Sequence, residues 1–379
     1  MKHLMREFKV EGTDWIQIQN DALKFLQTNN KKVNQAMILE YAANGYIEAY
    51  LGQKFREDSH KVKEDQFFFR PILTKKEFDI NKLYFEYKTY YLDNDDLSDI
   101  KLDTYRDVHF EFDPNYKEQI SFFIQAYISN FKFREKKEGK AEILDKDLVW
   151  LEALHKPTNN LQKFELLADA SLDNWSLEKF VVGKHVGDVV DFQAEPGLTL
   201  EIRILDCFKI TPEAVTDENA HKIGIENLKT VEDVKKYIFD SLMEQMVGEA
   251  LFNYGLKVID SIRDNNVAIE LPQDLVANDV KDFNFAPDFE GNKEETVESS
   301  VVNYFWFNFV AKNFDISITQ EELNYEIKRV KTFLNMNNPN DVNIKKVADA
   351  ILLKKLAKKI LDESEPLTVK EFGQYMIFK

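Results

Sequence analysis

The longest helical pattern in the chain runs through residues 231–265, and it constrains the fold more than any other feature. Thr230 and Asp233 have the spacing of a capping box at its start, and Asn265-Asn266 breaks it. Apolar residues recur at helical spacing at Val231, Val234, Ile238, Leu242, Met246, Leu251, Val258 and Ile262. The pattern predicts one long helix, and Pro212 is predicted to close whatever folds before it.

The chain after this helix is also predicted to be almost wholly helical. Val267, Ile269 and Leu271 alternate as an extended connector, and Pro272 occupies the favoured first position of the next helix. A polar interruption at 282–296 is followed by the most apolar stretch, 301–310. A basic amphipathic helix is predicted at 343–361, where packing in the domain is the first interpretation and membrane-surface binding the alternative.

Composition excludes several classes of protein. A length of 379 residues predicts two to three domains, and a net charge of −17 argues against a surface that binds nucleic acid, so no DNA partner is expected. Cys207 is the single cysteine, which excludes a disulfide framework. The six histidines lack metal-ligand spacing, so we expect no metal and no other cofactor. The N-terminus lacks an apolar signal core and no window approaches a membrane span, which predicts a cytoplasmic protein without membrane insertion.

The first segment, 1–112, is predicted to be a small α+β unit. A short strand at 8–10 precedes a helix capped by Thr13, and Asn34 caps a second helix. The alternation of Leu83, Phe85, Tyr87, Thr89 and Tyr91 predicts a half-buried strand.

The middle of the chain is predicted to be a linker helix followed by a compact strand-rich domain. The linker spans 113–139, with a helix at 116–133 and a charged boundary run at 134–139. Within 140–211 we predict strands at 144–151, 164–168, 189–192 and 198–208, a short helix at 175–180 and a tight turn at 195–197. The fold class is therefore α+β and multidomain.

Several motifs resemble the trigger factor family. Residues 210–280 resemble the start of that family's C-terminal domain in the order of their motifs. The order is Leu/Ile-x-Pro, an acidic linker, Lys-x-Gly, a helix that begins Thr-Val-Glu-Asp, and Val-x-Ile-x-Leu-Pro. Residues 177–192 resemble its FKBP-type prolyl isomerase domain, and 316–323 resemble a segment between its two C-terminal arms. The resemblance implies a trigger-factor-like N-terminal domain at 1–112, a reduced FKBP-like domain at 140–211 and a helical chaperone domain with arms at 212–379.

The resemblance also implies ribosome docking through the loop between the two N-terminal helices. In this chain the loop reads Thr28-Asn-Asn-Lys-Lys-Val-Asn-Gln35, without the family's Phe-Arg pair, glycines and proline. Lys31 and Lys32 are the docking candidates, and a pair of lysines binds RNA weakly and in a salt-sensitive way. An ordinary solvated loop is the alternative.

The isomerase site that the resemblance implies is altered. Where the family carries an aromatic residue and a glycine in its proline-binding cup, this chain has Glu152-Ala-Leu-His155, and the flap is cut to residues 193–197. The candidate residues of this degenerate pocket are Trp150, Glu152, Phe164 and Trp175, with core packing as the alternative role of the aromatics. We expect the domain to be a scaffold without catalysis.

Client binding is assigned to the aromatic residues of the apolar stretch, with a buried core helix as the alternative. These client-binding candidates are Tyr304, Phe305, Trp306, Phe307 and Phe309. The leading hypothesis is an ATP-independent, trigger-factor-like chaperone that binds unfolded or nascent polypeptides, with the large ribosomal subunit as a further partner. The alternatives are an active peptidyl-prolyl cis–trans isomerase and a structural partner-binding protein on the same fold. We expect a monomer or a weak homodimer.

Overall fold

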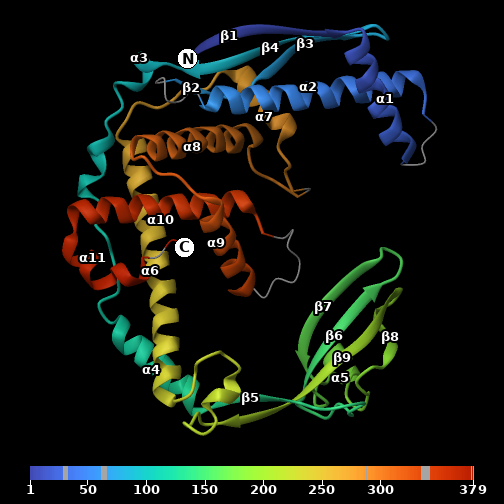
Figure 1. Ribbon diagram of the computed structural model, residues 1–379, viewed down its shortest axis with the longest axis vertical. Helices are drawn as coiled ribbons and strands as arrows, with labels where there is room; N and C mark the ends of the chain where they lie inside the picture. The colour runs from blue at the N-terminus through green and yellow to red at the C-terminus, as the bar shows by residue number, and fades with distance from the viewer. Residues whose placement is uncertain (29–32, 61–65, 287, 334–341, 377, 379) are drawn as a thin grey trace. The chain divides into compact units, whose positions relative to one another are not determined.

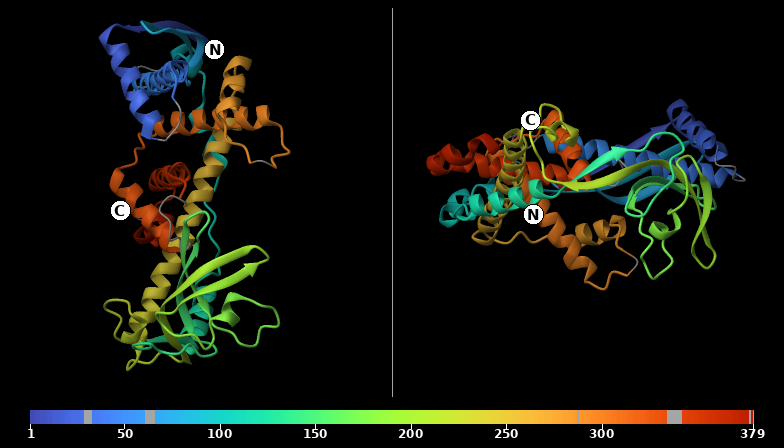
Figure 2. Two further views of the ribbon diagram at one scale, coloured as in Figure 1. Left: turned by 90° about the vertical axis from the view of Figure 1, so that its right-hand side faces the viewer. Right: turned by 90° about the horizontal axis from the view of Figure 1, so that it is seen from below.

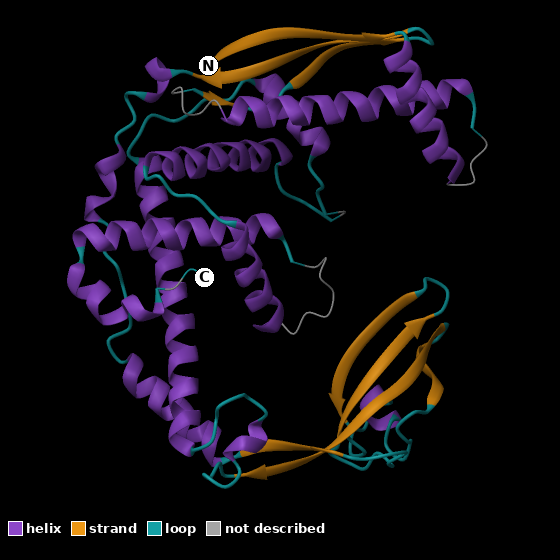
Figure 3. Cartoon of the chain, viewed as in Figure 1, coloured by secondary structure: helices purple, strands orange, loops and turns teal. Residues whose placement is uncertain are grey.

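A computed structural model describes the chain except for residues 29–32, 61–65, 287, 334–341, 377 and 379. The described part forms two compact units. Unit 1 comprises Met1–His109 and Gly255–Ser317, and unit 2 comprises Phe110–Tyr254 and Ile318–Lys379. The fold class is α+β as predicted, with an N-terminal α/β region, a central antiparallel sheet and a helical C-terminal region (Figures 1 and 3).

Unit 1 begins with an antiparallel sheet. Its strands are β1 (Lys2–Glu11), β2 (Phe67–Phe68), β3 (Ile72–Phe78) and β4 (Lys82–Leu92). β4 is central, because it pairs with β1 along one edge and with β2 and β3 along the other. The predicted alternation on β4 is confirmed from Leu83 to Thr89, whose inward-facing side chains are buried.

Two helices cover one face of this sheet, α1 (Thr13–Thr28) and α2 (Gln35–His60) (Figure 1). The predicted cap of the second helix is present, because Asn34 Oδ1 accepts a hydrogen bond from Met37 N at 2.9 Å. Trp15 is fully buried, and its indole N–H donates to the carbonyl oxygen of Asp79 at 2.8 Å. Burial of this large side chain with its donor satisfied fixes α1 against the sheet.

The second segment of unit 1 contains α7 (Gln273–Asp282) and α8 (Lys293–Asn313), and a short α3 (Asn94–Leu97) lies in the first segment. Asp274 of α7 accepts hydrogen bonds from Lys88 and from the hydroxyl of Tyr90, the latter at 2.8 Å. Asn266 pairs with the backbone of Lys101 at 2.8 and 2.9 Å. Residues that sequence reasoning assigned to a C-terminal domain therefore pack with the N-terminal region.

Unit 2 contains the second sheet. Its strands are β5 (Phe131–Lys136), β6 (Leu148–His155), β7 (Asn160–Leu167), β8 (Val189–Glu195) and β9 (Leu198–Glu213), with α5 (Leu177–Phe180) between β7 and β8. The strands are antiparallel in the order β5-β9-β6-β7, and β8 also pairs with β9 (Figure 1). Figure 2 shows this sheet, coloured green, from two further sides. The buried core of this sheet includes Ile143, Val149, Leu151, Ile202 and Ile204.

Three predictions in this region need correction. The helix predicted at 116–133 ends earlier, since α4 spans Tyr116–Ser129 and residues of the charged run continue as β5. Pairing with a distant strand explains the difference, because β5 pairs with residues 208–213 of β9, and Arg134 also forms a bidentate ion pair with Glu165 of β7 at 3.0 and 3.2 Å. Pro212 does not close the strand. It lies within β9 opposite Lys132, where only β5 pairs with β9, so its missing N–H costs no ladder bond.

The third correction concerns the strand predicted at 144–151. The observed strand, β6, begins and ends four residues later, at Leu148–His155. Residues 145–147 form the turn that enters β6, and Lys146 there has a positive φ of 66°. Asp147 fixes this turn, because its carboxylate accepts a hydrogen bond from Leu144 N at 2.7 Å and one from Lys137. This side-chain to backbone bond competes with strand pairing, and the alternating pattern alone does not report it.

Besides α7 and α8, the helices of the C-terminal half are α6 (Val231–Asp264), α9 (Gln320–Phe333), α10 (Ile344–Ser364) and α11 (Pro366–Phe372). The predicted capping box of α6 is confirmed, since Asp233 N donates to Thr230 Oγ1 at 3.1 Å and Thr230 N donates to Asp233 Oδ2 at 2.9 Å. The apolar side of α10 is buried, including Ile351 and Leu356, which favours the packing interpretation of this helix. Among the described helices, none combines the length and the hydropathy that crossing a membrane requires.

Candidate functional site

The docking candidates Lys31 and Lys32 lie outside the described residues. The helices that flank them carry an exposed aromatic pair. Phe25 of α1 stacks on Tyr41 of α2 with ring centroids 5.3 Å apart, and both side chains are exposed. The end of the hairpin is thus partly apolar, a feature that the two lysines alone did not indicate.

The structure separates the five client-binding candidates on α8. Phe305, Trp306 and Phe309 are core residues, and Trp306 is only 1% exposed. Tyr304 and Phe307 are half-buried. The hypothesis of a client surface is therefore not supported for Phe305, Trp306 and Phe309, because a buried ring presents no area to a partner.

The packing of α8 explains this burial. Phe305 meets Phe67 of β2 edge-on at a centroid distance of 4.9 Å, and it stacks on Phe309 at 5.4 Å. Tyr304 lies against Phe55 and Phe67 at 6.4 and 6.1 Å. Apolar residues surround α8 because the N-terminal region covers it, and that cover comes from residues distant in the sequence.

The four residues of the predicted isomerase pocket do not form one site. Trp150 and Glu152 lie on the outer face of β6, where Trp150 Nε1 donates to Glu165 at 3.1 Å. Phe164 is opposite the buried Leu151 and packs on the inner face of the sheet. Since directly paired residues share a face, Phe164 is separated from Trp150 and Glu152 by the sheet itself.

Glu152 is held as a carboxylate. Lys163 Nζ lies 2.7 Å from it and Arg203 lies 3.8 Å away. The hydrogen bond from Lys163, followed by the charges of both cations, lowers the pKa of Glu152. A paired carboxylate with a lowered pKa is a poor proton donor at neutral pH, so Glu152 has no acid role here.

Trp175 belongs to a different aromatic cluster on the inner side of the sheet. Its ring stacks on Phe192 of β8 at 6.0 Å and meets Phe180 of α5 at 5.7 Å, while Phe180 and Phe192 are 5.1 Å apart. Trp175 is 62% exposed, so water reaches this cluster. The sequence analysis did not single out Phe180 and Phe192. The usable signal is that Phe180 lies in the short helix that follows Trp175 and that Phe192 lies in the alternating strand after it.

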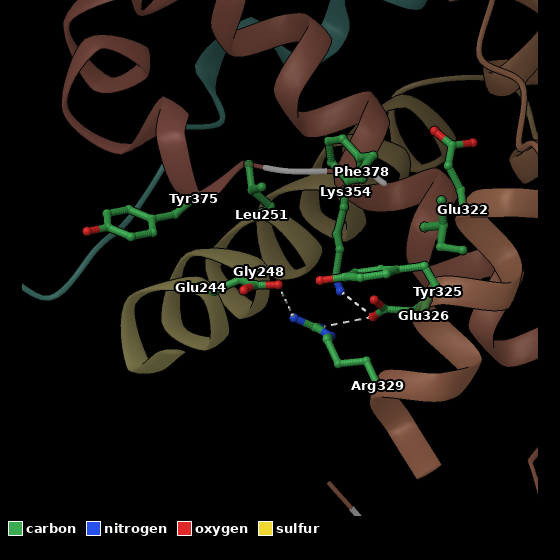
Figure 4. Close-up of a pocket in the computed structure, with 11 residues that line it drawn as sticks. Glu244, Gly248, Leu251, Glu322, Tyr325, Glu326, Arg329, Lys354, Tyr375 and Phe378 are labelled. Atoms are coloured by element: carbon green, nitrogen blue, oxygen red, sulfur yellow. Dashed lines mark hydrogen bonds and ion pairs between the residues drawn. The ribbon is translucent and has the colours of Figure 1, made fainter. Parts of the chain in front are cut away.

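Unit 2 also contains a network of partly buried charges (Figure 4). Glu326 of α9 accepts hydrogen bonds from Lys354 of α10 at 2.8 Å and from Arg329 at 3.0 Å. Arg329 also reaches Glu244 of α6 at 3.4 Å. Burial opposes ionisation of Glu326, but the hydrogen bond and the charge of Lys354, with those of Arg329, outweigh it and lower the pKa.

This network is structural. The cavity among these side chains is about 20 Å³, which is room for about one water molecule. Its charged groups pair with one another and connect α6, α9 and α10. The Cys207 thiol is no nucleophile either, because burial raises its pKa to about 11. Within the described residues, no group of three or more His, Cys, Asp or Glu side chains could hold a metal ion.

The most exposed aromatic surface is on α4, which sequence reasoning treated as a linker. Phe122 is 79% exposed, and Phe123 and Tyr127 are exposed beside it. Phe123 stacks on Tyr127 at 6.1 Å, and Tyr127 lies 5.2 Å from Phe131. We call Phe122, Phe123, Tyr127 and Phe131 the α4 ridge.

Only one narrow strip of α4 packs inward, at Tyr116, Ile120, Ile124 and Ile128. The four-residue spacing of this strip accounts for the buried face, so the aromatic residues between its members must point elsewhere. The helical pattern of 116–129 therefore contained a signal for the ridge, namely large apolar residues outside the isoleucine strip.

Comparisons with known proteins give a distant likeness among the solved structures. No family model matches this chain, and no curated protein matches it. Among solved structures, the chain is similar to a structure of the trigger factor chaperone. The description of that structure concerns promiscuous substrate recognition in the folding and assembly activities of that chaperone. The match covers 96% of this chain and 97% of that chain at 17% sequence identity, with a TM-score of 0.38.

Proposed function

We propose that this protein is an ATP-independent chaperone that binds apolar segments of unfolded or nascent polypeptides. The observation that carries the proposal is the α4 ridge, where Phe122, Phe123 and Tyr127 are exposed on one short helix. Contiguous exposed apolar side chains are typical of sites that bind other proteins.

Aromatic side chains suit this task for a physical reason. Each buries a large area on contact and has few rotatable bonds, so little conformational entropy is lost. Burying a phenylalanine side chain contributes about 1.5–3 kcal/mol, so a few contacts suffice for reversible holding. The hydrophobic effect supplies this free energy without a nucleotide.

The ridge also has a solubilising frame. Lys117, Glu118 and Gln119 share α4 with it and are exposed, and the chain has a net charge of −17. A charged surface around a small apolar area resists self-association while leaving that area open to a client.

The test is suppression of aggregation of a chemically denatured client by the full-length chain, followed by light scattering. Replacing Phe122 and Phe123 with serine should reduce the suppression several-fold without loss of helical circular dichroism. Leu367→Ser is the matched control, because Leu367 is 80% exposed in the same unit but lies on α11. Full activity of the double variant would remove the ridge from the proposal, and an inactive wild-type chain would favour a structural partner-binding protein.

Prolyl isomerisation is a second candidate that one observation favours. The cluster of Trp175, Phe180 and Phe192 brings three rings together on the inner side of the unit 2 sheet. An isomerase needs an apolar cup that excludes water from the planar amide, and the exposure of Trp175 argues against such a cup.

A further inference from the structure

A large cavity lies along α2 in unit 1. Its volume is about 1160 Å³, and it is lined by residues 44–56 of α2, residues 70–73 before and within β3, and the end of α7. Leu51, Phe55 and Leu73 give it apolar walls. We call this cavity the α2 groove. Its volume exceeds that of most small-molecule sites, and its extent along a helix fits an extended chain segment.

The helix wall of the groove is smooth at Gly45 and Ala49. Gly45, Ala49 and Gly52 line it one turn apart; a Cβ atom added at Gly45 would meet nothing within 4 Å, whereas one added at Gly52 would lie 3.7 Å from the guanidinium of Arg56. A bound backbone can therefore approach α2 closely. Such access suits a polypeptide, whose side chains can then reach Leu51 and Phe55.

Two contacts orient the groove. Lys76 Nζ of β3 donates to Asn44 Oδ1 of α2 at 2.7 Å. At the other end, Phe55 of α2 and Phe67 both pack against the ring of Tyr304. Residues 67–76 therefore run antiparallel to α2 along the groove.

This orientation places Arg56 and Arg70 towards the same end of the groove. Both line it, and neither has an ion-pair partner among the described residues. Their neighbour Lys54, which does not line the groove, is paired with Glu57 at 2.6 Å. Two guanidinium groups in the groove without a carboxylate in ion-pair contact point to a carboxylate supplied by a ligand.

Three carboxylates of the described residues lie in or beside the groove, and none of them forms an ion pair with Arg56 or Arg70. Glu48 lies eight residues before Arg56 on α2, a rise of about 12 Å. Asp282 lines the groove from the end of α7, and Asp279 faces Arg70. Burial raises the pKa of Asp279, against the opposing charge of Arg70.

We propose that the α2 groove binds an extended polypeptide segment that carries apolar side chains and an acidic residue next to them. This inference rests on the proposed chaperone function and names a class of client for it, with Arg56 and Arg70 as the anchors of the carboxylate. The apolar walls take the neighbouring side chains, and the smooth face of α2 admits the backbone.

The experiment measures binding of fluorescein-labelled twelve-residue peptides to the full-length chain by fluorescence anisotropy. One peptide alternates leucine with glutamate, and its partner replaces every glutamate with glutamine. We expect the acidic peptide to bind roughly five- to tenfold more tightly at low salt, as two exposed ion pairs allow. The double variant R56Q/R70Q should lose this preference.

Two matched controls separate charge and shape from damage to the fold. Lys24 and Arg106 are exposed, paired and outside the groove, so K24Q/R106Q should keep the preference. Ala49→Trp should fill the groove and weaken both peptides. Gln53→Trp, on the exposed side of the same helix, should weaken neither.

Equal affinity for the two peptides, or a preference that survives R56Q/R70Q, would overturn the inference. A wild-type dimer that R56Q/R70Q dissociates would place a second copy in the groove and overturn it too. These results leave the α4 ridge untouched, because aggregation suppression and its loss in the Phe122 and Phe123 variant are measured separately. If aggregation suppression fails but the acidic preference holds, the groove inference stands and the chaperone proposal falls.

Discussion

The ring of Phe305 meets the ring of Phe67 edge-on, with 4.9 Å between their centroids. One residue lies on α8 and the other on β2, so the contact joins segments more than two hundred positions apart in the sequence. The most apolar stretch of the chain is thereby used to hold α8 against the N-terminal region. A fragment of residues 212–379 would expose these rings because it lacks their cover, and holding by such a fragment would not report on the intact protein.

Alanine at Trp306 should destabilise unit 1. Its side chain is buried, and truncation of a buried tryptophan costs about 3–5 kcal/mol through lost apolar burial and the cavity left behind. Urea unfolding of the full-length variant measures this loss. Phe307→Ala, at a half-buried position on the same helix, should cost clearly less, and equal costs would contradict the assignment of Trp306 to the core.

If the loop at 28–35 is a ribosome-docking site, replacing Lys31 and Lys32 with glutamate should abolish co-sedimentation with ribosomes. Cation–phosphate contacts release counterions, so binding of the wild-type chain should also weaken steeply as salt is raised. Co-sedimentation over a salt series checks both expectations. Lys24→Glu on α1 serves as the control, and docking would lie elsewhere if the double variant still bound.

The full-length chain should not accelerate cis–trans exchange of a Xaa-Pro peptide above the uncatalysed rate. Trp150 and Glu152 lie across the sheet from Phe164, and Trp175 is open to water, so the described residues offer no dry aromatic cup. A protease-coupled assay or exchange spectroscopy measures the rate. Turnover that disappears in Trp175→Ala would establish the isomerase candidate instead.

Lys354→Met should destabilise unit 2 by about 1.5–3 kcal/mol, because the mostly buried carboxylate of Glu326 loses the hydrogen bond from Lys354 and keeps only that from Arg329. Urea unfolding at neutral pH measures the effect. Lys358→Met is the control, since Lys358 pairs with the exposed Asp362 on the same helix. A similar cost for both variants would show that the buried network contributes no more than a surface pair.

The same network predicts a pH dependence. The pKa of Glu326 is lowered in the folded state, so its ionised form contributes stability that is fully present above the unfolded value of about 4.3 and is lost as the pH falls below it. Unfolding free energy measured between pH 7 and pH 3 should therefore decline at the acid end. The decline should be shallower in Lys354→Met, and an unchanged slope would contradict the role of Lys354.

Local signals predicted local structure well. The helices at α1, α2, α6 and α10 follow from apolar spacing and from caps such as Asn34 and Thr230, because each of these signals involves neighbours within four residues. The errors lie where pairing with a distant strand determines the local structure. β5 replaces the end of a predicted helix because β9 offers it a partner, and Pro212 stays in its strand because the neighbouring edge is unpaired there.

The candidate sites show the same division. The sequence alone determined the α+β class, the main helices and the amount of aromatic surface that the chain must either bury or present. It could not determine which aromatics are exposed, because burial depends on what covers a helix. The 255–317 segment packs with 1–109, which buries Phe305 and Trp306, whereas α4 packs through a single isoleucine strip and leaves Phe122 and Phe123 in solvent. Only the tertiary structure decided this, since a side chain's exposure is a property of its neighbours in space and not of its neighbours in the chain.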